Sequence, residues 1–174
     1  MQAQNVGETA FTTVSIVNGK VLFQQLISTD EGLSEESQYG MLQNWAKRNY
    51  AGNPLLQSIR FNRDEHNVSI SLKEELPLSK ESQYASEKVM MSYRFDVNVT
   101  SSGAVLTVRD ISYQSVKGDK SAFLSSPTAA EQTITNSAIS AAGENKNLLS
   151  QIRQHSLDAI NQLYVQVCRA FELK

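Results

Sequence analysis

Cysteine, histidine and proline are scarce in this sequence, and no long apolar run is present. Among its 174 residues, one is cysteine, two are histidine and three are proline. Because Cys168 is the only cysteine, no disulfide can form within the chain. No run approaches the roughly 18 apolar residues that suggest a membrane-spanning helix. We therefore expect a fold held together by apolar packing, with no membrane span.

Charge is modest, and neither sign dominates. Sixteen lysine and arginine residues are set against 18 aspartate and glutamate residues, so the net charge is −2. Nucleic-acid binding draws much of its affinity from cations that neutralise phosphates, so no nucleic-acid partner is predicted. Serine, threonine, asparagine and glutamine make up about a third of the chain, yet hydrophobic residues still account for 40%. The length favours a single domain over residues 1–174, with a core over about 11–114.

Apolar alternation predicts an antiparallel sheet. Asn18-Gly19 divides an apolar segment over 11–27, and both residues tolerate the positive φ angles of a tight hairpin turn. Two strands are expected over 56–61 and 68–76, and residues 88–100 alternate most strictly. The apolar face of that last strand consists of Val89, Met91, Tyr93, Phe95, Val97 and Val99.

The next predicted strand, residues 104–113, changes phase along its length. Leu106 and Val108 are followed by Ile111 and Tyr113, so the apolar positions shift by one residue. An extra residue in one strand produces such a shift. We therefore expect a β-bulge near Arg109-Asp110.

Helical periodicity predicts two helices that cover one face of this sheet. Ser34 is a suitable N-cap for a helix that ends near Tyr50, and a long amphipathic helix is expected over 146–171. Residues 115–145 are predicted to be a linker or to contain a short helix. Within them, Thr128-Ala129-Ala130-Glu131 fits a capping box. The predicted fold class is α+β.

No familiar catalytic or cofactor motif is present. The sequence lacks a nucleophile elbow, a zinc-protease motif and a dinucleotide-binding glycine pattern. Neither His66 nor His155 has a cysteine or second histidine at zinc-ligand spacing. No histidine lies at helical spacing to activate Cys168. We therefore predict no catalytic residue, no metal site and no cofactor, and we expect a protein that is not an enzyme.

Four short segments resemble a known family. They are Asn-Gly-Lys-Val-Leu-Phe at 18–23, Asn-Trp-Ala-Lys at 44–47, Tyr-Arg-Phe-Asp-Val at 93–97 and Thr-Ala-Ala-Glu at 128–131. Together they resemble a family of uncharacterised exported proteins of gut Bacteroidetes, which contain a domain of unknown function with a TBP-like fold, that is, like the TATA-box-binding protein. The resemblance covers about residues 18–113 and implies that fold.

The same resemblance bears on localisation. Members of that family usually begin with a signal peptide, which implies an extracytoplasmic place in the periplasm or envelope. Residues 1–5 lack the basic and apolar parts of a signal peptide. This start suits either a cytosolic protein or the mature end of an exported one.

Two functions are compatible with the sequence. The first is a non-enzymatic cell-envelope protein that binds a partner protein, a glycan or a small ligand through the sheet face without helices. The alternative is a hydrolase-type enzyme with a site of dispersed acidic and polar residues. The missing nucleophile and the missing histidine-based acid–base pair favour binding.

The candidate binding residues are Arg94, Asp96 and Asn98. With Ser92 they alternate with the apolar positions of the same strand and form a polar strip about 20 Å long. We expect Arg94 and Asp96 to act as hydrogen-bonding anchors for a ligand. The TBP-like fold does not by itself predict DNA binding, because function resides in a site and not in a fold.

Overall fold

The main sheet has six antiparallel strands, of which five follow the order β3-β7-β6-β5-β4 and the sixth, β8 (Thr128–Ala129), pairs with β7. The computed structural model describes residues 10–78, 88–116 and 124–172. Strand β6 lies at the centre, so its alternating side chains define the two faces of the sheet. The five consecutive strands are β3 (Phe23–Ile27), β4 (Leu56–Asn62), β5 (Asn67–Leu76), β6 (Val89–Thr100) and β7 (Gly103–Ser115).

The expected first hairpin is shorter than predicted. Asn18 and Gly19 do form its turn, with φ angles of 52° and 77°, but the paired strands β1 (Ile16–Val17) and β2 (Lys20–Val21) have two residues each. The chain then leaves the hairpin, and β3 pairs along its whole length with β7. The hairpin turn predicted at Asn18-Gly19 is confirmed, but the second arm of the hairpin ends at Val21 and does not extend to Ile27. The buried side chains of β3 fill the main core, whereas Ile16 is 55% exposed.

The predicted bulge is confirmed in β7. The β6–β7 register shifts by one residue between the pairs Ser92–Ser112 and Arg94–Arg109. Asp110 takes up the extra residue with a φ angle of 55°, in the left-handed region. The apolar side chains on both sides of the bulge consequently face the core.

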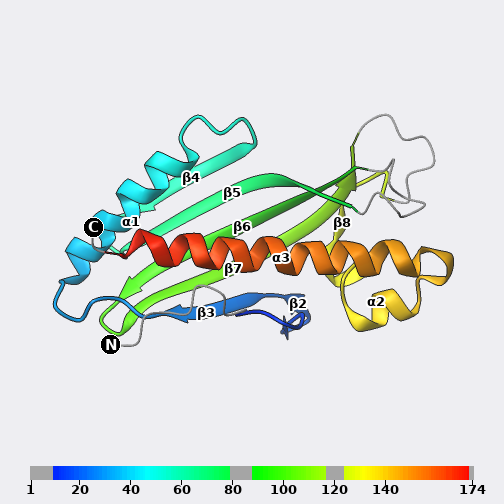
Figure 1. Ribbon diagram of the computed structural model, residues 1–174, viewed down its shortest axis with the longest axis horizontal. Helices are drawn as coiled ribbons and strands as arrows, with labels where there is room; N and C mark the ends of the chain where they lie inside the picture. Colours follow the sequence, from blue (N-terminus) through cyan, green and yellow to red (C-terminus); the bar gives the residue numbers. More distant parts are fainter. Residues whose placement is uncertain (1–9, 79–87, 117–123, 173–174) are drawn as a thin grey trace.

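Helices α1 (Glu35–Tyr50) and α3 (Lys146–Ala170) cover the same face of the sheet (Figure 1). Helix α1 contacts β5 and β6, and α3 contacts β5 and β7. Ser34 is the N-cap of α1, and its Oγ accepts a hydrogen bond of 3.1 Å from the backbone N–H of Ser37. The predicted α+β class, with two helices on one sheet face, is confirmed.

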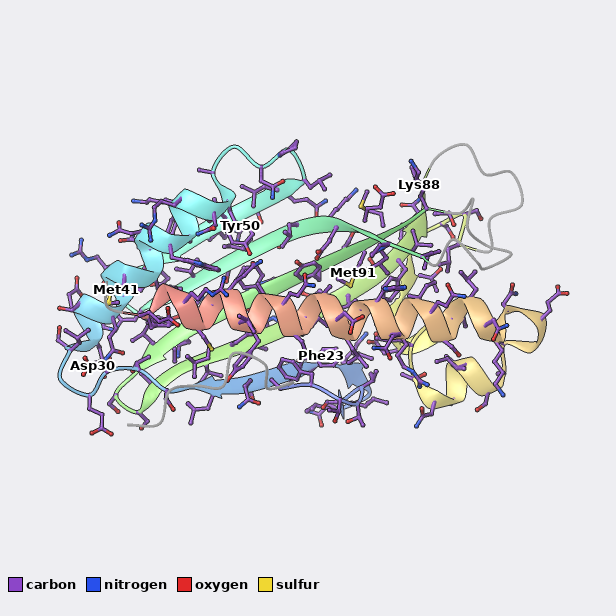
Figure 2. The ribbon with its side chains drawn as sticks, in the orientation of Figure 1. Phe23, Asp30, Met41, Tyr50, Lys88 and Met91 are labelled. Carbon is purple, nitrogen blue, oxygen red and sulfur yellow. The ribbon has the colours of Figure 1, made fainter. Side chains whose placement is uncertain are left out.

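The core lies between these two layers. Trp45 of α1 is 5% exposed, and its ring meets that of Tyr50 edge to face at 5.5 Å. Phe23 and Met91, labelled in Figure 2, are fully buried. The six apolar residues predicted for one face of β6 are all buried, so the predicted phase of this strand is confirmed.

Residues 124–145 form several short elements beside α3. These are β8 (Thr128–Ala129), which pairs with β7, the 3₁₀ helices η1 (Ala130–Gln132) and η2 (Gly143–Asn145), and the short helix α2 (Asn136–Ser140). The expected capping box at Thr128 is wrong, because Thr128 lies in a strand. The N-cap of α2 is Thr135, whose Oγ1 accepts a hydrogen bond of 3.2 Å from the backbone N–H of Ala138.

In the described parts of the chain, no helix combines the length and the apolar character that a bilayer-spanning segment needs.

Candidate functional site

The sheet face opposite α1 and α3, which we call the open face, carries the predicted polar strip. The side chains of β6 that point to this face are partly exposed, whereas the intervening Tyr93 and Phe95 are buried beneath the helices. The strip therefore lies where the alternation of β6 predicts it. It consists of Ser92, Arg94, Asp96 and Asn98.

Asp96 is the centre of a hydrogen-bonded network on the open face. Its carboxylate lies 3.2 Å from Nη2 of Arg94 and 3.1 Å from Nη2 of Arg109. The hydroxyl of Ser69, on β5, donates a third hydrogen bond to it. The Asp96 side chain is only 13% exposed, compared with 39% for Arg94 and 42% for Arg109. Asp96 is thus a counter-ion that fixes two more exposed arginine side chains.

Strand register explains why this carboxylate is needed. Arg94 and Arg109 are directly opposite each other across β6 and β7. Like charges in that position destabilise a sheet. Asp96 lies two residues along β6 on the same face and contacts both arginines. The two anchors proposed from the sequence therefore differ in role: Arg94 presents donors, and Asp96 positions them.

Asn98 lies beside this network but not within it. Its position on β6 is opposite Asn67 of β5, whose Nδ2 donates a 3.2 Å hydrogen bond to the hydroxyl of Ser69. The Asn98 side chain forms no hydrogen bond with another residue in the described ranges. Its amide is therefore available at the end of the strip.

Arginine donors outnumber the acceptors on the open face. Arg60 of β4 is exposed, lies opposite Ser69, and has no ion pair within the described residues. Each guanidinium carries five N–H donors in a planar fork that suits carboxylate groups. The open face therefore carries more positive than negative side chains, which suits it to bind an acidic group: Arg60, Lys73, Arg94 and Arg109 against Asp96 and Glu75.

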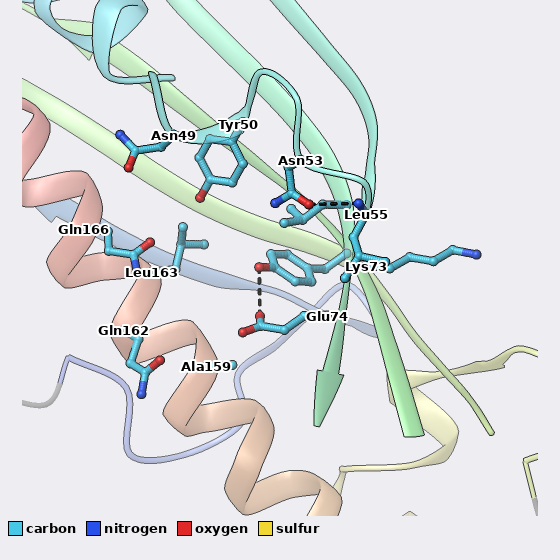
Figure 3. A pocket seen from close by; sticks show the side chains of 12 residues that line it. Asn49, Tyr50, Asn53, Leu55, Lys73, Glu74, Ala159, Gln162, Leu163 and Gln166 are labelled. Carbon is cyan, nitrogen blue, oxygen red and sulfur yellow. Dashed lines mark hydrogen bonds between the residues drawn. The ribbon is translucent and has the colours of Figure 1, made fainter. Parts of the chain in front are cut away.

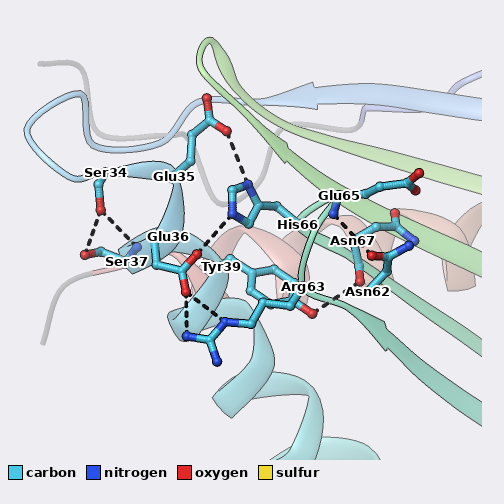
Figure 4. Close-up of polar contacts among 10 residues, drawn as sticks. All are labelled: Ser34, Glu35, Glu36, Ser37, Tyr39, Asn62, Arg63, Glu65, His66 and Asn67. Atoms are coloured by element: carbon cyan, nitrogen blue, oxygen red, sulfur yellow. Dashed lines mark hydrogen bonds and ion pairs between the residues drawn. The ribbon is translucent and has the colours of Figure 1, made fainter.

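A second polar cluster joins α1 to the β4–β5 turn (Figure 4). Nδ1 of His66 lies 3.2 Å from Glu35, and Nε2 lies 3.1 Å from Glu36. The imidazole of His66 therefore lies between the two carboxylates. Arg63 also binds Glu36, at 2.7 Å, and hydrogen bonds from Arg63 and then His66 lower the pKa of Glu36. The cluster fastens the start of α1 to the sheet.

Sequence reasoning missed several of these contacts. His66 is about 30 residues from its two glutamates, so no local motif reveals the cluster. Ser69 and Arg109 join Asp96 only through the register of three strands. The bulge at Asp110, which was predicted, is the one sequence signal that bears on how Arg109 is placed.

A known protein family matches more than half of the chain. Residues 23–114 match the family described as a domain of unknown function (DUF4468) with TBP-like fold. The chain belongs to this family. The matched region includes α1 and strands β3 to β7, except the last residue of β7. It therefore contains Arg60, Ser69, Arg94, Asp96 and Arg109 of the open face.

Two solved structures share the fold. A TBP-like protein from Parabacteroides distasonis ATCC 8503 is 20% identical, with a TM-score of 0.73 over 90% of this chain and 96% of that chain. A DUF4468 family protein from Bacteroides ovatus ATCC 8483 is 16% identical, with a TM-score of 0.68 over 92% of this chain and 91% of that chain. No curated protein gave a significant match. The predicted family and TBP-like fold are confirmed.

Proposed function

We propose that this DUF4468 protein is a non-enzymatic cell-envelope protein that binds an acidic surface of a partner protein through its open face. The proposal rests on one observation: Arg94 and Arg109 both form ion pairs with the largely buried carboxylate of Asp96. Arginines fixed in this way lose less conformational freedom on binding than free side chains do. Their remaining donors are then directed at a carboxylate of the partner.

The dimensions of the open face favour a protein over a small ligand. Strand spacing of about 4.8 Å gives five strands a width of roughly 19 Å, and a strand of the length of β6 spans roughly 40 Å. The area of the open face, its width multiplied by its length, is therefore close to the roughly 800 Å² that each protein buries in a typical interface. Leu26 of β3, which is 53% exposed, supplies an apolar contact near the Asn98 end of this face.

An envelope location is supported by the family. The structural neighbours come from Parabacteroides and Bacteroides, and the family that the sequence resembles usually carries signal peptides. Cell fractionation of the native organism, with an antibody against the chain, tests the location. Recovery with the cytoplasmic fraction alone would contradict it.

The hydrolase alternative has less support on the open face. An acid–base mechanism needs two groups of different protonation that converge on a substrate. The described network on this face contains one carboxylate, Asp96, which is already bound by two arginines and a serine. This arrangement suits the positioning of arginines better than proton transfer.

The binding proposal is tested with charge variants of the full chain. Arg60→Glu reverses an exposed charge that has no ion pair in the described residues, so folding should be unaffected. The double variant Arg94→Gln with Arg109→Gln keeps amide donors near Asp96 while removing both positive charges. Arg48→Glu, on an exposed position of α1, is the matched control.

Capture of partners from envelope extracts is then compared among these variants. We expect at least about tenfold weaker capture for Arg60→Glu and for the double variant, and unchanged capture for Arg48→Glu. A glycan array and a DNA-binding assay run in parallel. Selective binding of acidic glycans or of DNA by the wild type, lost in the same variants, would replace the protein partner by that ligand.

A further inference from the structure

A cavity of about 310 Å³ lies between the C-terminal end of α1, strand β5 and helix α3 (Figure 3). Ligand pockets usually have volumes of roughly 300–1,000 Å³, so this cavity suits a small molecule. Its amide-bearing lining residues are Asn49, Asn53, Gln162 and Gln166. The cavity lies on the helix side of the sheet and is therefore separate from the open face.

The hydroxyl of Tyr50 points into this cavity without a partner (Figure 3). Tyr50 is 6% exposed, and its hydroxyl makes no hydrogen bond with any residue in the described ranges. Burial, and then the negative charge of Glu74, raise the pKa of Tyr50, so the group stays a neutral hydroxyl. Its oxygen is not fully enclosed by protein atoms, so a ligand in the cavity can reach it. A ligand in the cavity would supply the missing contact.

Glu74 gives the cavity a negative charge. Its Oε2 accepts a 3.1 Å hydrogen bond from the hydroxyl of Tyr93, which is itself buried. Glu74 is partly buried, and it forms no ion pair with another described residue. Lys73 borders the cavity, but Figure 3 shows that its side chain extends away. A partly buried carboxylate without a counter-ion favours a cationic ligand.

We propose that this cavity binds a small organic amine, with its ammonium group paired to Glu74 and hydrogen-bonded to the Tyr50 hydroxyl. An ammonium has three donors and no acceptor, which matches a carboxylate and a free hydroxyl oxygen. The rings of Tyr50 and Tyr93 add the aromatic surface that attracts cations. The proposal is independent of partner binding at the open face.

A second cavity extends the site. Its volume is about 470 Å³, and it shares Glu74, Ala159 and Gln162 with the first. Its lining adds His155 and Asp158 of α3, and Asp158 contributes a second carboxyl group. A second positive group on an elongated amine would therefore lie near further negative charge, so diamines are expected to bind better than monoamines.

The test compares three probes of equal chain length by isothermal titration calorimetry. Putrescine carries two ammonium groups, butanediol carries two hydroxyls, and succinate carries two carboxylates. We expect saturable binding of putrescine at up to millimolar concentrations, and no saturable binding of butanediol or succinate. Absence of putrescine binding, or equal binding of butanediol, would overturn the proposal.

Two variants assign the binding to this cavity. Glu74→Gln keeps an acceptor for Tyr93 but removes the charge, and it should weaken putrescine binding at least about tenfold. Tyr50→Phe should weaken binding several-fold without lowering the melting temperature of the free protein, because the hydroxyl has no partner to lose. Glu65→Gln, an exposed position in the β4–β5 turn, is the matched charge control. Unchanged binding by folded Glu74→Gln would also overturn the proposal.

Discussion

The Asp96 carboxylate lies 3.1 Å from the Arg109 guanidinium on the neighbouring strand of the open face. Arg94, directly opposite Arg109, contacts the other carboxylate oxygen at 3.2 Å. One acid thus holds two arginines that would otherwise repel each other. The Asp96 side chain is only 13% exposed, whereas those of Arg94 and Arg109 are 39% and 42% exposed. We therefore infer that the acid is structural and that the arginines face a ligand.

This relationship predicts that the residues are energetically coupled. Asp96→Asn should lower the free energy of unfolding by about 1–3 kcal/mol, because it leaves two opposed arginines without a counter-ion. Arg109→Gln should destabilise the protein less in the Asp96→Asn background than in the wild type. Urea denaturation of the four proteins in this double-mutant cycle measures the coupling. Additivity within about 0.5 kcal/mol would show that the pair is not coupled.

Two glycines should respond to alanine in opposite directions. Gly103, at the start of β7, has a φ of +133°, and a Cβ there would lie 2.5 Å from the carbonyl oxygen of Ile27. Gly103→Ala should therefore cost about 1–3 kcal/mol. Gly40, within α1, has no atom within 4 Å of such a Cβ, so Gly40→Ala should stabilise by about 0.5–1 kcal/mol. Melting curves of both variants check this, and shifts of the same sign would contradict it.

Trp45 should be the most costly side chain of α1 to remove. It is buried and contacts the ring of Tyr50, so Trp45→Ala should lower the free energy of unfolding by about 3–5 kcal/mol. Asn44→Ala, at the exposed position beside it, should stay within about 0.5 kcal/mol of the wild type. A loss below about 1 kcal/mol for Trp45→Ala, measured by chemical denaturation, would remove Trp45 from the core.

The cluster around Glu36 should contribute to stability only when this carboxyl is ionised. Hydrogen bonds from Arg63 and His66 lower the pKa of Glu36 in the folded state. A lowered pKa means that the contribution is complete above the unfolded value, about 4.3, and is lost as the pH falls through the folded value. The stability advantage of the wild type over Glu36→Gln should therefore shrink on acidification below about pH 4.

Unfolding measurements across the acid range test this pH dependence. Glu65→Gln serves as the control, because Glu65 is exposed in the same turn and has no ion pair in the described residues. Its stability should follow that of the wild type at every pH. If the free energies of unfolding of the wild type and Glu36→Gln change in parallel with pH, the ionised Glu36 carboxyl does not stabilise the start of α1.

The sequence predicts those parts of the fold that depend on local periodicity. Strict alternation in β6 separates Phe95 from Arg94, and the phase change in β7 locates the bulge at Asp110. Prediction from the sequence fails where pairing between strands that are far apart in the chain determines the fold. Phe23 follows a good hairpin turn, yet its strand pairs with β7, because burial of its side chain in the main core outweighs continuation of the hairpin.

The site was only partly predictable for the same reason. Arg94 and Asp96 are found on the face that alternation assigns to them, but Arg109 joins them through strand register. The cavity beside Tyr50 is assembled from a helix end, a strand and the C-terminal helix, so no spacing in the sequence brings Tyr50 together with Glu74.

Binding of a partner protein through the open face is tested most directly by site-specific photocross-linking in intact cells. A photoreactive amino acid replaces Gln24, an exposed residue of β3 in the row that contains Thr107 and Asp96. The same probe at Gln154, exposed on α3, is the control. We predict a discrete cross-linked partner from position 24 that is lost in the Arg94→Gln, Arg109→Gln background. Cross-linking of that partner from position 154 alone would contradict binding through the open face.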